Sequence, residues 1–151
     1  MKKYAIITII FIIVFTSISC QLIYGPDLPV SIKISHIDST IIENNGIGED
    51  WQNIFWKVDG IELDTGVEYT MFSSTWEELI ITTHYEEYDE TYTDIGENKY
   101  REEIYKIIKN SGTKFGLNIY NTIYEQRSAN PTYSGTNAVF CDTFEIEIVY
   151  N

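Results

Sequence analysis

The chain has 151 residues, of which 23 are acidic and 10 are basic, so its formal net charge at pH 7 is −13. A surplus of negative charge this large disfavours DNA, RNA and anionic lipid headgroups as direct partners, and favours cations and basic surfaces. The two cysteines, Cys20 and Cys141, are too few for a disulfide framework.

The first twenty residues have the pattern of an export signal. Lys2 and Lys3 precede an apolar run over residues 5–15, and a small, mostly polar stretch then leads to Cys20. Since the run is shorter than the roughly 20 residues that span a membrane, it predicts a signal peptide over residues 1–19. The end of this segment resembles the lipobox of bacterial lipoproteins. The resemblance implies that Cys20 becomes an acylated N-terminus, with ordinary secretion and cleavage nearby as the alternative.

The remaining chain predicts one folded domain on a short tether. Residues 20–29 include Gly25, Pro26 and Pro29 and are expected to form the tether of a lipid-anchored cell-envelope protein. Residues 30–151 are enough for one domain with one core. After removal of the signal peptide, 8 basic residues face 23 acidic ones, a formal net charge of −15.

The domain has the composition of a β protein, rich in Ile, Tyr, Thr and Phe. Apolar and polar residues alternate with a period of two between turn-forming residues. The alternating segments predicted to be strands are 30–35, 53–59, 67–73, 78–85, 115–124 and 144–150. They predict an all-β fold, a single antiparallel β-sandwich of about seven or eight strands.

Two parts of this prediction are less direct. Residues 100–109 place Ile104, Ile107 and Ile108 at helical spacing, although the same segment also fits a strand. We predict a strand there. If Cys20 is acylated, Cys141 is left unpaired and is predicted to be a small buried residue of a strand.

An acidic segment runs from His84 to Gly96 and contains no Lys or Arg. Its five carboxylates are Glu86, Glu87, Asp89, Glu90 and Asp94. Like charges this dense repel one another. Two interpretations stay open: a solvated acidic loop, or a loop that binds a hard cation such as Ca²⁺ through oxygen ligands.

A second acidic segment, His36 to Gln52, is predicted to connect the first two strands. Its oxygen ligands would come from Asp38, Glu43, Asn44, Glu49 and Asp50. Gly46 and Gly48 allow backbone carbonyls to turn towards an ion. The spacing does not fit an EF-hand, and an ordinary surface loop is again the alternative.

The order of these features resembles a C2 domain: a first strand, an acidic loop ending in Asp50, and a later strand that enters an acid-rich loop closed by Asp94-Ile95-Gly96. The resemblance implies an eight-stranded sandwich whose calcium ions lie between loops at one end. An immunoglobulin-like sandwich is the alternative fold. The implied calcium ligands are Asp38 and Asp50 from the first loop, and Glu86, Glu87, Asp89 and Asp94 from the later one.

The motifs of common hydrolases do not occur. The two histidines, His36 and His84, have neither a Gly-x-Ser-x-Gly elbow nor a His-Glu-x-x-His motif. The sequence therefore predicts a non-enzymatic binding module whose acidic end takes up Ca²⁺ and recognises a protein, a glycan or a lipid headgroup. The alternative is a metal-free structural or adhesin-like sandwich that uses Tyr-rich faces.

Overall fold

The computed structural model describes residues 26–45, 47, 50–88, 93–124 and 137–151. The predicted signal peptide, the lipidation residue Cys20 and the acidic residue Asp89 lie outside the described residues. Among the helices within these ranges, none is long and apolar enough to cross a membrane.

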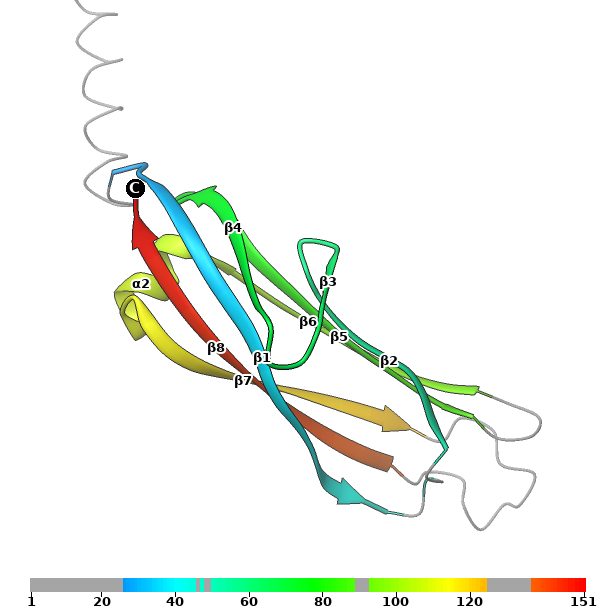
Figure 1. Cartoon of the computed structure of the whole chain (residues 1–151). Coiled ribbons are helices and arrows are strands. Elements are labelled where there is room, and N and C mark those ends of the chain that lie inside the picture. The colour runs from blue at the N-terminus through cyan, green and yellow to red at the C-terminus, as the bar shows by residue number, and fades with distance from the viewer. Residues whose placement is uncertain (1–25, 46, 48–49, 89–92, 125–136) are drawn as a thin grey trace, which may run out of the picture.

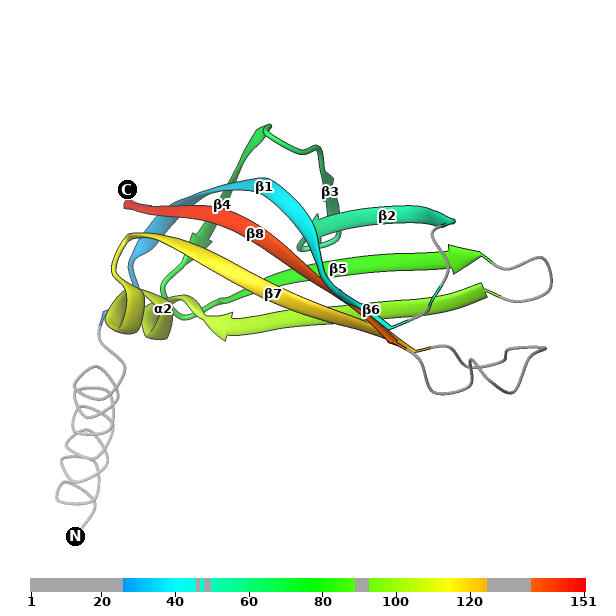
Figure 2. The same cartoon turned by 90° about the horizontal axis from the view of Figure 1, so that it is seen from below.

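Eight strands form two four-stranded antiparallel sheets packed face to face (Figures 1 and 2). The first sheet has the order β4-β1-β8-β7, with bounds Glu68–Ser74, Pro29–Asn44, Asn137–Tyr150 and Lys114–Tyr124. The second sheet has the order β3-β2-β5-β6, with bounds Ile61–Leu63, Trp51–Val58, Glu78–Tyr88 and Thr93–Glu103. The predicted antiparallel β-sandwich is confirmed.

The period-two alternation of the sequence fixes which face of each strand is buried. In β1, Val30, Ile32 and Ile34 point inward and are fully buried. They pair in register with Tyr150, Ile148 and Ile146 of β8. The pairing register is fixed because a slip of one residue would turn every apolar side chain of the strand to solvent.

The interior divides into two apolar clusters. The larger one gathers side chains from both sheets and from the helix described below, including Ile32, Ile81, Ile104 and Phe144. The smaller one consists of Ile47, Tyr85, Ile123, Ala138 and Phe140, with Trp51 packed against it. Buried polar side chains, described in the next section, lie between the two clusters.

A helix, α2, spans Ile104–Ser111 and corrects the strand predicted for residues 100–109. β6 accounts for residues 100–103, and the chain then turns into the helix because its isoleucines at helical spacing can reach the core. Ile104 and Ile107 are buried. The helix ends at Gly112, whose φ of 80° favours glycine and whose N–H donates to the Ile108 carbonyl at 2.9 Å.

Both segments predicted as acidic loops are mostly strand. β1 continues past His36 to Asn44 because its pairing with β8 survives two bulges. β5 continues to Tyr88, which pairs with Thr93 at the start of β6. Cys141 lies in β8 as predicted, but it is half-buried because its side chain is on the outer face of the sheet.

The elongated sandwich has two different ends (Figures 1 and 2). The first described residues, the C-terminus, α2 and the turn between β4 and β5 lie at one end, which we call the tether end. The opposite end, where β1, β5 and β7 stop and β2, β6 and β8 begin, we call the loop end. The 16 residues of β1 run from one to the other, a distance of about 50 Å at 3.3 Å per residue.

Candidate functional site

The loop end brings together segments that are far apart in the sequence. The N–H of Asn45, just after β1, donates to the carbonyl of Asn137 at 2.8 Å. The N–H of Tyr88 donates to the carbonyl of Asp50 at 3.1 Å. The connection between β1 and β2 therefore meets the end of β5.

Two acidic side chains are buried next to each other at this end. Glu87 of β5 and Asp94 of β6 are directly opposite in register and are only 1% and 2% exposed. On the other side of Glu87 stands Trp51 of β2. The ring of Trp51 meets Phe140 edge to face at 4.8 Å, so the two carboxylates lie beside the smaller apolar cluster.

Such an arrangement of like charges has a cost. Carboxylates directly opposite across two strands repel each other, and low exposure strengthens the repulsion because less water screens it. A shared proton or a bound cation offsets this cost. Glu87 and Asp94 are thus the described acidic residues best placed to respond to a cation.

The other predicted ligands are distributed differently. Asp50 is exposed at the loop end and offers its backbone carbonyl to Tyr88. Asp38 does not reach this end: it lies in the middle of β1 opposite Thr143, six residues or about 20 Å before the strand stops. Its predicted place in the first loop is wrong because β1 continues through that segment.

Glu86 points to the outer face of the second sheet, away from Glu87. Its carboxylate accepts hydrogen bonds from Asn53 at 2.6 Å and from His84 at 3.1 Å. These two bonds, Asn53 first, lower the pKa of Glu86 below its ordinary value. The ring of His84 stacks on Phe55 at 4.4 Å, so Glu86 belongs to a surface cluster and does not face the buried pair.

Across the described ranges, no group of three or more His, Cys, Asp or Glu side chains is close enough to hold a metal ion by itself. A cation at Glu87 and Asp94 would therefore need further oxygen ligands. Backbone carbonyls and water are ordinary Ca²⁺ ligands.

A buried polar network, which was not predicted from the sequence, lies in the middle of the sandwich. Its centre is Asp142 of β8, which is 0% exposed. Its Oδ1 accepts hydrogen bonds from Trp56 Nε1 at 2.8 Å, from the hydroxyl of Ser39 and from the hydroxyl of Tyr85. Because Ser39 lies in the first sheet and the two aromatic residues in the second, the carboxylate joins the two sheets.

His36 completes this network. Its Nε2 lies 3.7 Å from Asp142 Oδ1, its Nδ1 is 3.0 Å from Thr65 Oγ1, and its ring stacks on Trp56 at 3.7 Å. Burial raises the pKa of Asp142, but the interactions with its four neighbours outweigh burial and bring the pKa below its ordinary value. Burial, followed by the hydrogen bond to Asp142, raises the pKa of Tyr85.

The set of Ser39, His36 and Asp142 has the residue types of a hydrolase triad but not the arrangement. In a triad the carboxylate binds the imidazole nitrogen that faces away from the serine. Here Ser39 and Asp142 both face Nε2, at 3.3 and 3.7 Å, and Nδ1 faces Thr65. The carboxylate takes the serine proton directly as a hydrogen bond, which is the geometry of a structural network.

One signal in the sequence could have revealed this network. The inward stripe of β8 runs Ala138, Phe140, Asp142, Phe144, Ile146, with one acid among apolar residues at a strict period of two. A carboxylate in such a stripe must be buried with donors around it. The partners themselves cannot be identified without the fold, because they come from three separate parts of the chain.

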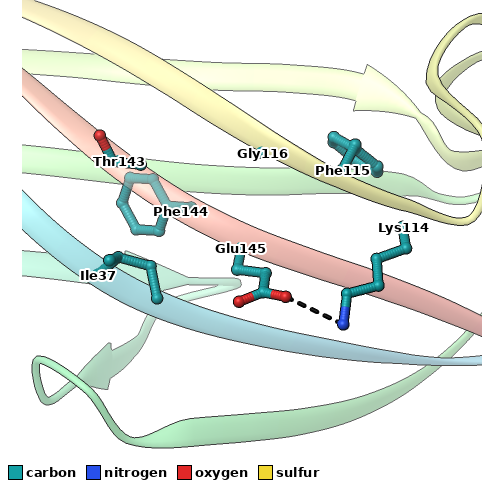
Figure 3. Close-up of a pocket in the computed structure, with 7 residues that line it drawn as sticks. All are labelled: Ile37, Lys114, Phe115, Gly116, Thr143, Phe144 and Glu145. Carbon is teal, nitrogen blue, oxygen red and sulfur yellow. Dashed lines mark ion pairs between the residues drawn. The ribbon is translucent and has the colours of Figure 1, made fainter.

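A shallow groove of about 380 Å³ lies on the outer face of the first sheet (Figure 3). Gly116 has no side chain to fill it, and Ile37 borders it. Lys114 and Glu145, 3.1 Å apart, form an ion pair at the groove (Figure 3). Because it is mostly apolar and carries only this exposed pair, the groove offers contact area but few fixed polar groups for a ligand.

Comparison with protein families found no family model that matches the chain, and comparison with curated proteins found no match. A function is accordingly inferred from the geometry of the two ends and of the polar network between them.

Proposed function

We propose that the protein is a lipid-anchored, non-enzymatic binding module of the bacterial cell envelope whose loop end binds Ca²⁺. The observation that carries the proposal is the pair of Glu87 and Asp94, directly opposite and buried where the two acidic segments meet. A divalent cation would remove the repulsion between the two carboxylates. Of the predicted ligands, Asp50 is near this pair because its carbonyl meets Tyr88 at the end of β5, and Asp89 follows Glu87 by two residues in the sequence. Asp38 is too far away to contribute.

The position of the tether supports a role for the loop end in recognition. An acyl chain on Cys20 would hold the tether end at the membrane, because residue 26 begins the described chain at that end (Figure 2). The loop end would then point away from the membrane, at a distance of about the length of β1. A site in that position reaches partners at a distance from the anchoring bilayer.

Calcium would serve here to shape a surface. By drawing the strand ends together, a bound ion would order the loop end and leave part of its coordination sphere for a protein, a glycan or a lipid headgroup. The net charge of −15 in the mature chain makes a nucleic acid an unsuitable partner, whereas an acidic headgroup becomes accessible once a cation bridges the two negative groups.

Thermal unfolding of the mature protein tests the metal site. A ligand that binds only the folded state stabilises it by about 2.7 kcal/mol at 100 times its dissociation constant, which for a domain of this size shifts the Tm by several degrees. We expect a saturable rise with Ca²⁺, reversed by EDTA, and loss of that rise in Asp94→Asn. Asp38→Asn is the matched control and should keep the full rise. An unchanged Tm at millimolar Ca²⁺ would refute the site.

A second candidate function is metal-free adhesion through the outer face of the first sheet. Tyr120 and Tyr124 project from the outer face of β7 and are 53% and 60% exposed. They are on the same face of the first sheet as the groove of Figure 3. Exposed Tyr side chains are frequent anchors of protein and sugar recognition. If adhesion to a bacterial or host surface persists in EDTA and falls in the double variant Tyr120→Ser and Tyr124→Ser, this candidate is favoured.

A further inference from the structure

We propose that the second half of β1 is an open sheet edge that binds an extended, basic segment of another protein by strand addition. The inference goes beyond the calcium site and does not depend on it. β4 covers only the first half of β1, where it pairs with residues 29–35 (Figure 1). From Asp38 to Asn44, β1 pairs with β8 on one side, and no strand of the described ranges pairs with the other side. We call this side the free edge.

Two backbone contacts show which groups of β1 point to the free edge. In an antiparallel pair, residues that exchange hydrogen bonds with the partner strand alternate with residues whose N–H and C=O point away from it. Asn45 is of the first kind, because its N–H donates to the carbonyl of Asn137 in β8 at 2.8 Å. His36 is of the second kind, because its carbonyl points away from β8 and accepts the N–H of Gly66 at 2.8 Å.

The alternation along β8 extends this assignment to the free edge. Phe144, Asp142 and Phe140 are alternate residues of β8, and Phe144 is opposite His36. The β1 residues opposite the other two are Ser39 and Ile41. Ser39 and Ile41 therefore also point away from β8, and each offers one N–H and one C=O to the free edge.

A side chain of the interior is left uncovered at the same place. Ile41 is opposite Phe140, which is 4% exposed and belongs to the smaller apolar cluster, so both are on the inner face of the sheet. Ile41 is nevertheless 43% exposed, because the sheet ends there. Ile37 and Ile42, at the two bulges, are exposed as well. An added strand would cover Ile41 and satisfy the backbone groups on either side of Thr40.

The bulges limit how long the added strand can be. Sheet edges are commonly protected by bulges and by charged side chains, which prevent uncontrolled pairing. Here the two bulges leave a regular stretch from Asp38 to Ile41. A short extended segment fits this stretch, in the manner of peptides that bind by adding a strand to a sheet.

Charge selects a basic segment as the occupant. The sequence from His36 to Gln52 contains no Lys or Arg, and Asp38 and Glu43 are exposed. Both are opposite residues on the outer face of β8, Thr143 and Val139. Opposite charges on neighbouring strands attract each other, so a Lys or Arg beside Asp38 is favoured. The partner segment would thus alternate basic residues on the outer face with apolar residues against Ile41.

The same charges disfavour a second copy of the chain. A symmetric contact brings the same surface of both copies together, so Asp38 and Glu43 would face the identical acids of the other copy. Each copy also has a net charge of −13, which adds to the repulsion.

Hydrogen exchange of individual amides, measured by NMR on the 15N-labelled protein, tests the edge and its occupant. The probe is a short, blocked peptide of alternating Lys and Val, and all samples contain EDTA so that the calcium site plays no part. Without peptide, the amides of Ser39 and Ile41 should exchange fast, whereas the amide of Thr40, bonded to β8, should exchange slowly. With peptide at about ten times its dissociation constant, exchange at Ser39 and Ile41 should slow by about tenfold.

Matched peptides and variants separate strand addition from simple charge attraction. Methylation of the Val amides blocks one edge of the peptide and methylation of the Lys amides blocks the other, without a change in charge. We expect one methylated peptide to protect Ser39 and Ile41 and the other to fail. Asp38→Lys should weaken binding of the parent peptide by about fivefold. Asp27→Lys, the same change of charge at the tether end, should leave binding almost unchanged.

Three results would overturn the proposal. Absence of protection by the parent peptide would mean that the edge does not accept a strand, and equal protection by both methylated peptides would mean that charge alone holds the peptide. Slow exchange of Ser39 and Ile41 before peptide is added would mean that the edge is already covered. The cover would be a second copy if this protection grows with protein concentration, and the chain itself if it does not.

Discussion

The two ends of the sandwich are formed by the same strands but contain different chemistry. Towards the tether end the interior is the larger apolar cluster, closed by the isoleucines of α2. Towards the loop end the interior changes to the smaller cluster around Tyr85 and Phe140, beside the buried acids Glu87 and Asp94. Apolar burial is the main source of folding stability. We therefore infer that the tether half contributes most of the stability of the domain, and that the buried acids of the loop half lower it.

The polar network around Asp142 is the boundary between the halves. It joins the two sheets in the interval between the two apolar clusters. Buried networks of this kind fix one arrangement of the elements that they connect. The comparison therefore makes definite predictions: the largest losses should follow damage at the boundary, intermediate ones at the loop end, and small ones at the surface.

The largest effect is expected for Asp142→Asn. The substitution removes the charge that organises three hydrogen-bond donors and His36, and a hydrogen bond to a charged group contributes about 1.5–3 kcal/mol. We expect a loss of about 3 kcal/mol or more in the free energy of unfolding, measured by urea denaturation. Asp38→Asn, in the neighbouring strand but exposed, should change it by less than about 0.5 kcal/mol. Equal effects of the two variants would contradict a structural role for the network.

The same carboxylate gives the expected pH dependence. The pKa of Asp142 in the folded protein is below its ordinary value of 3.8, so its charged form is stabilised by folding. This contribution is fully present above pH 3.8 and is lost as the pH falls through the lower, folded-state pKa. The difference in stability between wild type and Asp142→Asn should therefore shrink at pH values below 3.8; a difference that grows there would contradict the account.

At the loop end, the effect of Glu87→Gln on the free energy of unfolding should change sign when calcium is added. In EDTA the substitution removes a repulsion with Asp94 and should stabilise the fold by about 0.2–1 kcal/mol. In saturating Ca²⁺ it should cost up to about 2.7 kcal/mol, because the ligand contribution disappears. Differential scanning calorimetry of both proteins in both conditions checks the reversal. Destabilisation of the same size in both conditions would mean that Glu87 is only structural.

An intermediate effect is expected at Gly96, where β6 of the second sheet lies close to β7 of the first. A Cβ on Gly96 would collide with Ile123 and lie 2.8 Å from Asn121 Oδ1. Gly96→Ala should therefore cost about 1–3 kcal/mol. Gly116→Ala is the matched control in a neighbouring strand, since its nearest atom would be 3.9 Å away, and thermal unfolding should show little change. Similar losses in both would indicate a general intolerance of alanine in these strands.

The smallest effect concerns the surface cluster of Glu86. Asn53 has a positive φ of 48°, so Asn53→Gly keeps the backbone conformation while removing the amide that lowers the pKa of Glu86. We expect that pKa to rise towards its ordinary value of 4.5, as measured by carboxyl chemical shifts. The titration of Asp142 on the same samples serves as the control and should not move.

Much of the fold follows from alternation in the sequence. The strands around Ile32, Ile119 and Ile146 were predicted because one apolar face per strand is a local property. The end of the first strand could not be predicted, since bulges after His36 and Ile41 let it continue through polar residues. The helix at Ile104 was missed because the same isoleucine spacing fits both structures, and only the packing of the helix against the core decides between them.

The candidate site was predicted in part. The C2 resemblance implies that the acidic segments 36–52 and 84–96 meet at one end of the sandwich, and the backbone contact between Asp50 and Tyr88 joins one residue of each. Which acids turn inward depends on strand parity, so Glu86 and Glu87, adjacent in sequence, end on opposite faces. The partners of Asp142 come from separate strands that meet only in the folded protein. The sequence around Ser39 or Trp56 therefore does not predict their contact with Asp142.

The most direct test of the central claim is terbium luminescence at the loop end. Tb³⁺ replaces Ca²⁺ at oxygen sites and emits when a nearby indole is excited, and Trp51 stands opposite Glu87. We predict sensitised emission that saturates with Tb³⁺, is displaced by Ca²⁺ but not by Mg²⁺, and is lost in Asp94→Asn and in Trp51→Phe. Emission that persists in Asp94→Asn, or no saturable emission in the wild-type protein, would contradict calcium binding at Glu87 and Asp94.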